Sequence, residues 1–377
     1  MTTDNKKEAG QNKSHNRLVG VLDLGTTKVC CLIASVSGDG KLEIVGVGNR
    51  ASKGIRGGFI IDMDDAEKTI RTTVEAAERM AGGMIEKVVV NLSGWHPASK
   101  IVACETPVPG HEIGDLDIWR VLEQTNHLPN GFNDHDVVHM IPVGYTVDGT
   151  RGVRDPRGMY GERLGVNMHV VSASANALRN LDVTVNRCHL DIEEKIISPY
   201  ASALSCLVED EKRLGAVHID MGGGTTSIAV FFDGELVHVD VIPVGGGHVT
   251  NDIAQGLSTP LSASERLKTL YGNALSSPSD DRETVRVPMI GDGGVAEESQ
   301  VPRSILVGII KPRIEETFEL VRSRLESSGF DKVGGSRVVL SGGASQLPGT
   351  RELAALVLNK TVRLARPHAM PGLAEAI

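Results

Sequence analysis

The feature that most constrains the fold is a short pattern that occurs twice. An apolar stretch, an aspartate, a glycine-rich turn with two threonines and a second apolar stretch follow one another at residues 18–33 and again at residues 216–232. Apolar, β-branched runs separated by Gly and Thr predict a strand–turn–strand unit. Two such units predict an internally duplicated α/β chain with one unit in each of two domains.

The composition supports two or more domains and argues against a nucleic-acid-binding protein. The chain has 377 residues, more than the roughly 250–300 residues over which one hydrophobic core extends. Hydrophobic residues make up 40% of it, which excludes global disorder. A net charge of −9 provides no basic surface for phosphates, and 3% aromatic residues leave few rings for stacking on bases. We expect no nucleic-acid partner and, without a run of about 18 apolar residues, no membrane-spanning helix.

Further elements are expected around the two units. Residues 64–81 have apolar residues at helical spacing, with Asp64 as the N-cap and Gly82 as the stop signal. Residues 1–16 are polar and predict a disordered tail, and the acidic stretch 276–300 predicts a mobile loop. Other expected strands are 41–48, 87–92, 236–241 and 337–340, and other expected helices are 116–126, 175–188, 249–255, 263–271 and 304–327.

The first turn has the residue types of an anion site. Gly25 allows a tight turn whose backbone N–H groups point into one concavity, which suits phosphate oxygens. Thr26 and Thr27 add hydroxyl donors, and Lys28 adds a cation. Asp23, at the end of the strand, can hold a hydrated Mg²⁺, which needs few carboxylates. An ordinary β-hairpin with turn-favouring residues is the alternative for this segment alone.

The second turn repeats this order and strengthens the case. Two such hairpins can hold one polyphosphate from both sides, with Asp23 and Asp220 facing a single metal ion. The expected contacts of the second turn are Gly222, Gly223, Gly224, Thr225 and Thr226. A third segment, a strand that ends in Gly342 and Gly343, lets the backbone pass close to a flat group, for which the adenosine of a nucleotide is the natural candidate.

Taken in order, these segments resemble the phosphate-1, phosphate-2 and adenosine motifs of the actin, Hsp70 and sugar-kinase superfamily. The resemblance implies an actin-like fold: two α/β domains of the duplicated ribonuclease H-like type, with ATP and Mg²⁺ in the cleft between them. Gly246 and Gly247 resemble a further cleft segment. Glu265 and Lys268 share a helix face, and matching residues in relatives contact the ribose and adenine. A solvated ion pair is the alternative for those two residues.

Three other segments resemble the FtsA family of bacterial cell-division proteins: residues 52–58, 152–164 and 310–316. The resemblance extends over about residues 17–377. It implies an adaptor that polymerises with ATP, binds the C-terminal tail of the tubulin-like FtsZ and recruits later division proteins. It also implies anchoring of the FtsZ ring at the cytoplasmic face of the inner membrane through a C-terminal amphipathic helix.

The family pattern also implies a division into domains. Residues 17–86 and 167–199 are expected to form the first actin-like domain, to which residues 355–377 return. Residues 87–166 are expected to form an inserted, SHS2-like subdomain that serves self-assembly and recruitment. Residues 200–354 are expected to form the second domain, whose smaller lobe, about residues 249–315, is expected to receive FtsZ.

Two departures from the related families affect the expected activity. The family continues beyond the position of Ile377 with a strand-and-helix passage, a linker and the membrane helix, so direct membrane binding by this chain is doubtful. Hsp70 proteins and the rod-shape protein MreB have a carboxylate before the proline of the helix that links the domains, whereas Ser198 precedes Pro199 here. A serine hydroxyl is a poor general base. We assign no catalytic residue and expect slow or negligible ATP turnover.

Three other members of the superfamily are alternatives. A sugar or acetate kinase needs a further carboxylate aimed at a substrate hydroxyl, and none is evident. An Hsp70 chaperone needs a substrate domain after the nucleotide domain. A DNA-segregation filament of the ParM type lacks the inserted subdomain. Rapid ATP consumption with a sugar would favour the first of these.

Overall fold

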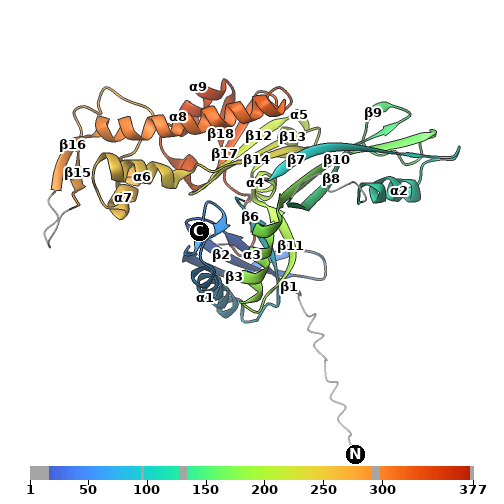
Figure 1. Cartoon of the computed structure of the whole chain (residues 1–377), viewed down its shortest axis with the longest axis horizontal. Coiled ribbons are helices and arrows are strands. Elements are labelled where there is room, and N and C mark those ends of the chain that lie inside the picture. The colour runs from blue at the N-terminus through green and yellow to red at the C-terminus, as the bar shows by residue number, and fades with distance from the viewer. Residues whose placement is uncertain (1–16, 95–96, 127–133, 291–297, 374–377) are drawn as a thin grey trace, which may run out of the picture.

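The computed structural model describes residues 17–94, 97–126, 134–290 and 298–373. The predicted N-terminal tail lies outside these residues. Figure 1 shows a lower body, an upper body that extends to the left and an arm that extends to the right. These are built respectively on a first five-stranded sheet, a second five-stranded sheet with a helical lobe, and a four-stranded sheet.

The first sheet has the strand order β11-β6-β1-β2-β3. The strand β1 pairs antiparallel with β2 and parallel with β6, β3 adds antiparallel to β2, and β11 adds parallel to β6. Alternating buried and exposed residues in β1 and β6 place one face of the sheet in the core. The bounds are β1 Arg17–Leu24, β2 Lys28–Val36, β3 Leu42–Ala51, β6 Lys87–Leu92 and β11 Asp191–Ile197.

The helix α1 (Met63–Ala81) packs on this sheet through an apolar stripe that includes Ile70 and Val74. The N-cap lies two residues before the predicted one: Asp62, not Asp64, accepts hydrogen bonds from the N–H groups of residues 64 and 65, each at 3.0 Å. The helix ends as predicted at Gly82, whose φ of 68° is left-handed. The helix α3 (Ala175–Asn186) contacts α1 and β11.

The second sheet repeats the topology of the first. Its order is β14-β13-β12-β17-β18, with β12 antiparallel to β13 and parallel to β17, just as β1 relates to β2 and β6. Two sheets of one topology confirm the predicted duplication. The bounds are β12 Ala216–Met221, β13 Thr226–Phe232, β14 Glu235–Ile242, β17 Arg337–Ser341 and β18 Thr361–Leu364, with α5 Glu209–Leu214 and α9 Thr350–Leu358 nearby.

The chain is expected to return to the first domain at residue 355, but it leaves the second domain later than that. The strand β18 pairs parallel with β17, so the second sheet continues to Leu364. The chain touches the first sheet only later, where the N–H of Ile44 donates to the carbonyl of Pro371 at 2.9 Å. The strand β18 covers the backbone hydrogen-bonding edge of β17, as β11 covers that of β6 in the first sheet.

The arm holds the inserted sheet β7-β10-β8-β9 with the helix α2 (Asp115–Asn126) on it. Its strands are β7 Ala98–Pro107, β8 His135–Val147, β9 Thr150–Val153 and β10 Arg163–Ser174. The expected boundaries of the insert, at residues 87 and 166, differ from the first and last residues of this sheet, Ala98 and Ser174. Residues 87–92 belong to the first sheet because Val88 and Val90 face its core, and residues 167–174 are the second half of β10, which continues across the insert.

The helix α4 (Ser198–Cys206) leads from the first sheet to the second. It follows β11 directly and contacts β12, β13 and β14. Tyr200 on this helix stacks on Phe231 with ring centroids 6.5 Å apart. One apolar cluster therefore runs from the core of the first sheet through α4 to the second sheet.

The lobe at the left of Figure 1 is built from helices and one hairpin. The hairpin pairs β15 with β16, so part of the predicted mobile loop is an ordered hairpin, while residues 291–297 lie outside the described residues. Arg313 forms a two-pronged ion pair with Asp252, with nitrogen–oxygen distances of 2.6 and 3.1 Å. Among the described residues, no helix is both long and apolar enough to cross a bilayer. The bounds are α6 Gly246–Gly256, α7 Leu261–Tyr271, β15 Thr284–Pro288, β16 Glu298–Pro302 and α8 Arg303–Ser328.

Candidate functional site

The two predicted turns have the same local structure. In the first, the N–H of Gly25 donates to the carbonyl of Lys28 at 3.0 Å, and in the second the N–H of Gly222 donates to the carbonyl of Thr225 at 2.9 Å. Each bond closes a turn between the first two strands of its sheet. The two turns are therefore equivalent in the two halves of the duplication.

The fold brings these two turns into direct contact. A Cβ atom placed on Gly223 would lie 2.3 Å from Cγ2 of Thr27, and one placed on Gly224 would lie 2.5 Å from Oγ1 of Thr26. Only glycine allows this approach, because such distances are far below ordinary contact. The predicted juxtaposition of the turns is present, and in this conformation their tips leave no room for a phosphate between them.

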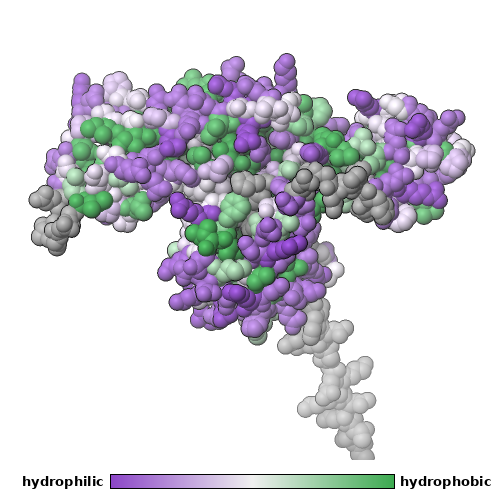
Figure 2. Space-filling view, viewed as in Figure 1, coloured by the Kyte–Doolittle hydropathy of each residue, from purple (hydrophilic) through white to green (hydrophobic). Residues whose placement is uncertain are grey.

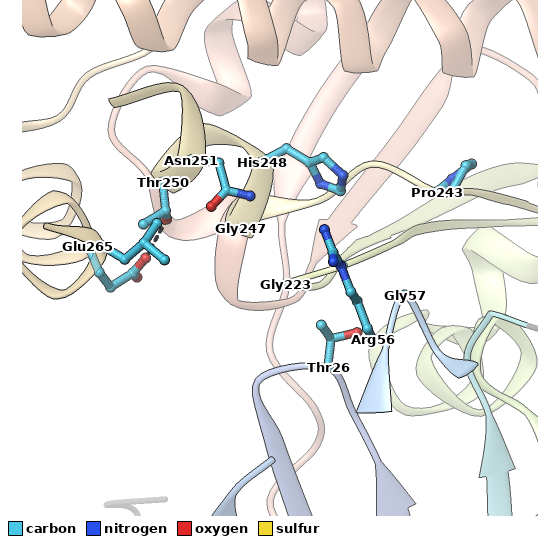
Figure 3. Close-up of a pocket in the computed structure, with 12 residues that line it drawn as sticks. Thr26, Arg56, Gly57, Gly223, Pro243, Gly247, His248, Thr250, Asn251 and Glu265 are labelled. Carbon is cyan, nitrogen blue, oxygen red and sulfur yellow. Dashed lines mark hydrogen bonds between the residues drawn. The ribbon is translucent and has the colours of Figure 1, made fainter. Parts of the chain in front are cut away.

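A cavity of about 410 Å³ opens beside the meeting point of the turns (Figure 3). This volume is in the usual range for small-molecule sites. Figure 3 shows residues of the first domain below the cavity and residues of the second domain above it and beside it. Five predicted site residues line it: Thr26, Gly223, Gly224, Gly247 and Glu265.

The start of α6 is bonded to the second turn. The N–H of Gly246 donates to the carbonyl of Gly222 at 2.9 Å, and the N–H of Gly247 donates to the carbonyl of Gly223 at 2.7 Å. These two N–H groups are therefore occupied by the turn. Gly246 and Gly247 position the turn and form part of the cavity wall, where a side chain on Gly247 would come within 2.9 Å of the carbonyl oxygen of Gly223.

Glu265 and Lys268 form a bonded network with Thr250 at the far end of the cavity. The ammonium of Lys268 donates to Oε2 of Glu265 at 2.7 Å, to the hydroxyl of Thr250 at 2.8 Å and to the carbonyl of Gly246 at 3.1 Å. Desolvation acts to raise the pKa of Glu265, but the hydrogen bonds from Lys268 and Thr250 lower it overall. The carboxylate therefore lines the cavity in its charged form.

The third predicted segment lies behind the second turn. Gly342 has a φ of 85°, and a Cβ atom on it would lie 2.3 Å from Oδ1 of Asp220. Gly343 begins a 3-10 helix (η1, Gly343–Gln346) and has open space beside it. The next residue, Ala344, approaches Gly246, where an added Cβ would be 3.0 Å away. Neither glycine is among the residues that line the cavity.

The two predicted metal ligands lie at the ends of β1 and β12. Desolvation raises the pKa of Asp23, Lys28 lowers it and the charge of Asp220 raises it again. Desolvation also raises the pKa of Asp220, although hydrogen bonds from the hydroxyls of Ser202 and Ser341 favour its charged form. Two mutually repelling carboxyls with raised pKa values are a donor set that a cation would stabilise.

The described residues fit a metal ion that keeps most of its waters. They contain no group of three or more His, Cys, Asp and Glu side chains that could enclose a metal ion. Mg²⁺ needs few protein ligands, so the pair Asp23 and Asp220 suits it. Neither aspartate lines the cavity, so a metal ion shared between them and a ligand in the cavity requires the turns to separate.

The remaining predicted contacts lie away from the cavity. Lys28 is exposed at the start of β2, and Thr225 is 8% exposed inside the turn. Thr226 is fully buried and donates its hydroxyl proton to the carbonyl of Val244 at 2.8 Å. That bond uses the only donor of the side chain, so Thr226 holds β13 to the segment before α6.

Sequence reasoning missed several lining residues. Arg56 and Gly57 come from the short hairpin β4 (Ile55–Arg56) and β5 (Phe59–Ile60), a segment recognised for its family resemblance but given no role. His248 lies on α6, and its Nδ1 accepts a hydrogen bond from the N–H of Gly245 at 3.1 Å. The others are Pro243, Asn251 and Leu261, whereas Thr250 belongs to the segment after Gly246 and Gly247 that resembles a cleft segment. Only their position next to a glycine turn or on the helix after it could have indicated them.

Comparisons with known proteins agree with this architecture. The family model "Cell division protein FtsA" matches residues 217–377, and the model "SHS2 domain inserted in FTSA" matches residues 94–172. The second range begins after β6 and ends within β10, so its bounds lie within a few residues of those of the inserted sheet.

Solved structures of low sequence identity share the fold. The PilM–PilN type IV pilus biogenesis complex has a TM-score of 0.62 at 16% identity, with 93% of this chain and 88% of that chain covered. MreB5 of Spiroplasma citri bound to ADP has a TM-score of 0.55 at 15% identity, with 93% and 92% covered. The fold is thus actin-like, with an SHS2 insertion.

Curated relatives match over almost the whole chain. The cell division protein FtsA of Agrobacterium fabrum (strain C58) is 44% identical, with 98% of this chain and 85% of that protein covered. FtsA of Pseudomonas aeruginosa is 38% identical (97% and 86% covered), and FtsA of Escherichia coli K12 is 33% identical (95% and 86% covered). The chain therefore belongs to the family of the bacterial cell division protein FtsA.

Proposed function

We propose that this chain is an ATP-binding division adaptor that polymerises and links FtsZ to the inner membrane. The observation that carries the proposal is the contact of two equivalent turns, one from each half of a duplicated fold, beside a cavity lined by both halves. The solved MreB5 structures bound to ADP and to AMPPNP, which share the fold, support a nucleotide as the ligand.

In this proposal the phosphates lie near Thr26, Gly223 and Gly224, and the adenosine extends toward Thr250 and Glu265. The hydroxyl of Thr26 is a donor for phosphate oxygens, and the carboxylate of Glu265 is an acceptor for ribose hydroxyls. Asp23 and Asp220 would hold Mg²⁺ through its waters once the turns separate. The turns can be in contact or separated. If ATP binds one of these two states more tightly, it increases the population of that state and so controls assembly.

We further propose that ATP turnover is slow. Ser198 lies close to Asp23 in a polar network, because the side-chain amide of Asn91 donates to the hydroxyl of Ser198 at 3.0 Å and also to Asp23. The hydroxyl of Ser93 is 2.9 Å from that of Ser198. None of these neutral groups is a general base near neutral pH. Phosphate release from ATP far below the roughly 1–100 turnovers per second of kinases would agree with this assignment.

The lobe of the second domain is our candidate for FtsZ binding. Figure 2 shows hydrophobic surface at this end of the molecule. Leu270 and Tyr271 at the end of α7 are 58% and 44% exposed, and Ile305 in the first turn of α8 is 47% exposed. The two helices meet there, since Nε of Arg303 donates to the carbonyl of Tyr271 at 2.9 Å. An exposed apolar surface of this kind suits the apolar side chains of a short peptide.

The insert is our candidate for self-assembly and recruitment of later division proteins, at the cytoplasmic face of the inner membrane at the division site. In the family, attachment to the inner membrane uses a C-terminal amphipathic helix. The insert is joined to the second domain as well as to the first: Arg154 pairs with Asp233, and β14 contacts β7, β8 and β10. A change in the cleft can therefore reach the insert through the second sheet.

The test is co-sedimentation with preassembled FtsZ filaments in the presence of Mg-ATP. We expect the chain to pellet with full-length FtsZ and to stay in the supernatant with FtsZ that lacks its C-terminal tail. Ile305→Asp should reduce pelleting, whereas Leu356→Asp on α9, where Leu356 is 71% exposed, should not. Folded, ATP-binding chain that fails to pellet with full-length FtsZ would refute the adaptor function and reopen the kinase and segregation alternatives.

A further inference from the structure

We propose that Arg56 binds the outermost phosphate of a nucleoside triphosphate in the cavity. The proposal deepens the nucleotide site proposed above and rests on it. It assigns a phosphate-binding role to the hairpin β4–β5 of the first domain, in addition to the two turns.

Arg56 is placed at the phosphate end of the cavity. It lines the cavity together with Thr26 of the first turn and with Gly223 and Gly224 of the second. Figure 3 shows its side chain rising from the first domain past Thr26 toward Gly223 and His248. The guanidinium therefore reaches from one domain toward the other, at the point where the two turns meet.

The hairpin that presents Arg56 is held in place by its backbone. Ile55 is 6% exposed and belongs to the core of the first domain. Gly57 and Gly58 have φ values of 57° and 79°, which suit a two-residue hairpin turn. A Cβ on Gly58 would lie 2.3 Å from the backbone nitrogen of Gly94, so the turn lies directly against the segment after β6. The backbone of Arg56 is thus fixed before a ligand arrives, so binding has only to order its side chain.

The charge of Arg56 is not neutralised by the rest of the site. Its side chain forms no hydrogen bond or ion pair with another residue in the described part of the chain, and it is the one Lys or Arg among the described residues that line the cavity. The one carboxylate in the lining, Glu265, is already paired with Lys268. A free guanidinium beside glycine turns suits a phosphate, which it can bind through two parallel N–H donors.

The position of Glu265 decides which phosphate Arg56 would meet. A carboxylate repels phosphates, so the phosphate chain runs away from Glu265 and the adenosine lies near it. Arg56 lies at the opposite end, beside Thr26 (Figure 3). It therefore meets the last phosphate of the chain, whereas Lys28, the cation predicted at the first turn, does not line the cavity.

The test compares the affinities of ATP, ADP and AMP for the full chain with Mg²⁺, by calorimetric titration. Arg56→Ala should weaken ATP binding by on the order of tenfold or more, because it removes a charge-assisted contact. It should weaken ADP binding less and leave AMP binding unchanged. Arg56→Gln should behave like Arg56→Ala, and Arg56→Lys should retain part of the affinity for ATP.

The control is Arg50→Ala, which removes the same charge from the exposed end of β3, outside the cavity, and should change none of the three affinities. Arg56→Ala with an unchanged ratio of ATP to ADP affinity would overturn this inference, as would an equal loss for all three nucleotides. Wild-type chain that binds none of them would overturn the proposed nucleotide function itself, so the two failures are distinguishable.

Discussion

Gly223 and Thr27 belong to different domains and touch across the cleft, since a Cβ placed on Gly223 would lie 2.3 Å from Cγ2 of Thr27. This contact joins the two halves of the duplicated fold at the equivalent point of each half. Adding or removing one methyl group at this contact should therefore change the distance between the two turns.

Gly223→Ala should destabilise the closed arrangement, because the new methyl group overlaps Cγ2 of Thr27 and overpacking typically costs about 1–3 kcal/mol. Thr27→Ser removes Cγ2 and keeps the hydroxyl, so the double variant should recover most of the loss. Thermal unfolding of the four chains without nucleotide measures the coupling. Additive shifts in unfolding temperature would show that the turns do not touch.

Asp220→Asn should lower the affinity for ATP in Mg²⁺ strongly and should lower it little when Mg²⁺ is replaced by a chelator. The substitution removes one charge of the proposed metal pair and can keep the hydrogen bond from Ser202, whose hydroxyl lies 2.5 Å from Oδ2. Ser202→Ala is the matched control for that bond. Equal affinities of wild type and Asp220→Asn in Mg²⁺ would remove Asp220 from the metal site.

The same substitution should stabilise the nucleotide-free chain at neutral pH. The pKa of Asp220 is raised above its ordinary value of 3.8 in the folded state, so the folded state binds this proton more tightly than the unfolded state does. The stability that this proton contributes is lost as the pH rises through the raised pKa. The excess in unfolding temperature of Asp220→Asn should therefore grow from pH 4 to pH 8. An excess that shrinks over this range would contradict the assignment.

Glu211 and Arg363 test the assignment of β18 to the second sheet. Glu211 is 4% exposed, and Arg363 donates to both of its carboxylate oxygens, at 2.7 and 2.6 Å. Hydrogen bonds to charged groups contribute about 1.5–3 kcal/mol, and the guanidinium of Arg363 is 40% exposed and can be hydrated when its partner is removed, so Glu211→Ala should destabilise the second domain by about that amount. Urea unfolding would measure it, with the exposed pair variant Glu209→Ala as the control. A loss as small as that of the control would separate β18 from this sheet.

The duplicated units could be predicted from sequence because their signal is local. Each consists of apolar strands and a glycine turn, and the contacts of Gly25 and Gly222 that close the turns involve residues three positions away. The two parallel edge strands, β11 and β18, could not be predicted in this way. The strand β11 reads DIEEKII and β18 reads TVRL, and neither has a clear alternation of apolar residues. Their place depends on the neighbouring strand and not on their own pattern.

The candidate site was only partly predictable for a related reason. Glycines and threonines near the turns can be named from the pattern, but which of them face a cavity depends on how two distant sheets meet. Thr226 is turned into the second domain toward Val244, while Thr26 faces the cavity. No local pattern marks Arg56 as a cavity residue, because it reaches the cavity only when its hairpin lies beside turns that are distant in the chain.

Binding of ATP in the cavity between the two domains is tested most directly by titration of a matched pair of variants. Asn251 lines the cavity on α6, and Gln255 lies one turn later on the same helix, exposed and outside the cavity. Calorimetric titration with Mg-ATP should give one saturable site in wild type and in Gln255→Trp, and no binding in Asn251→Trp, whose indole would fill the cavity. Equal affinity of Asn251→Trp and wild type, or no binding by folded wild type, would contradict the account.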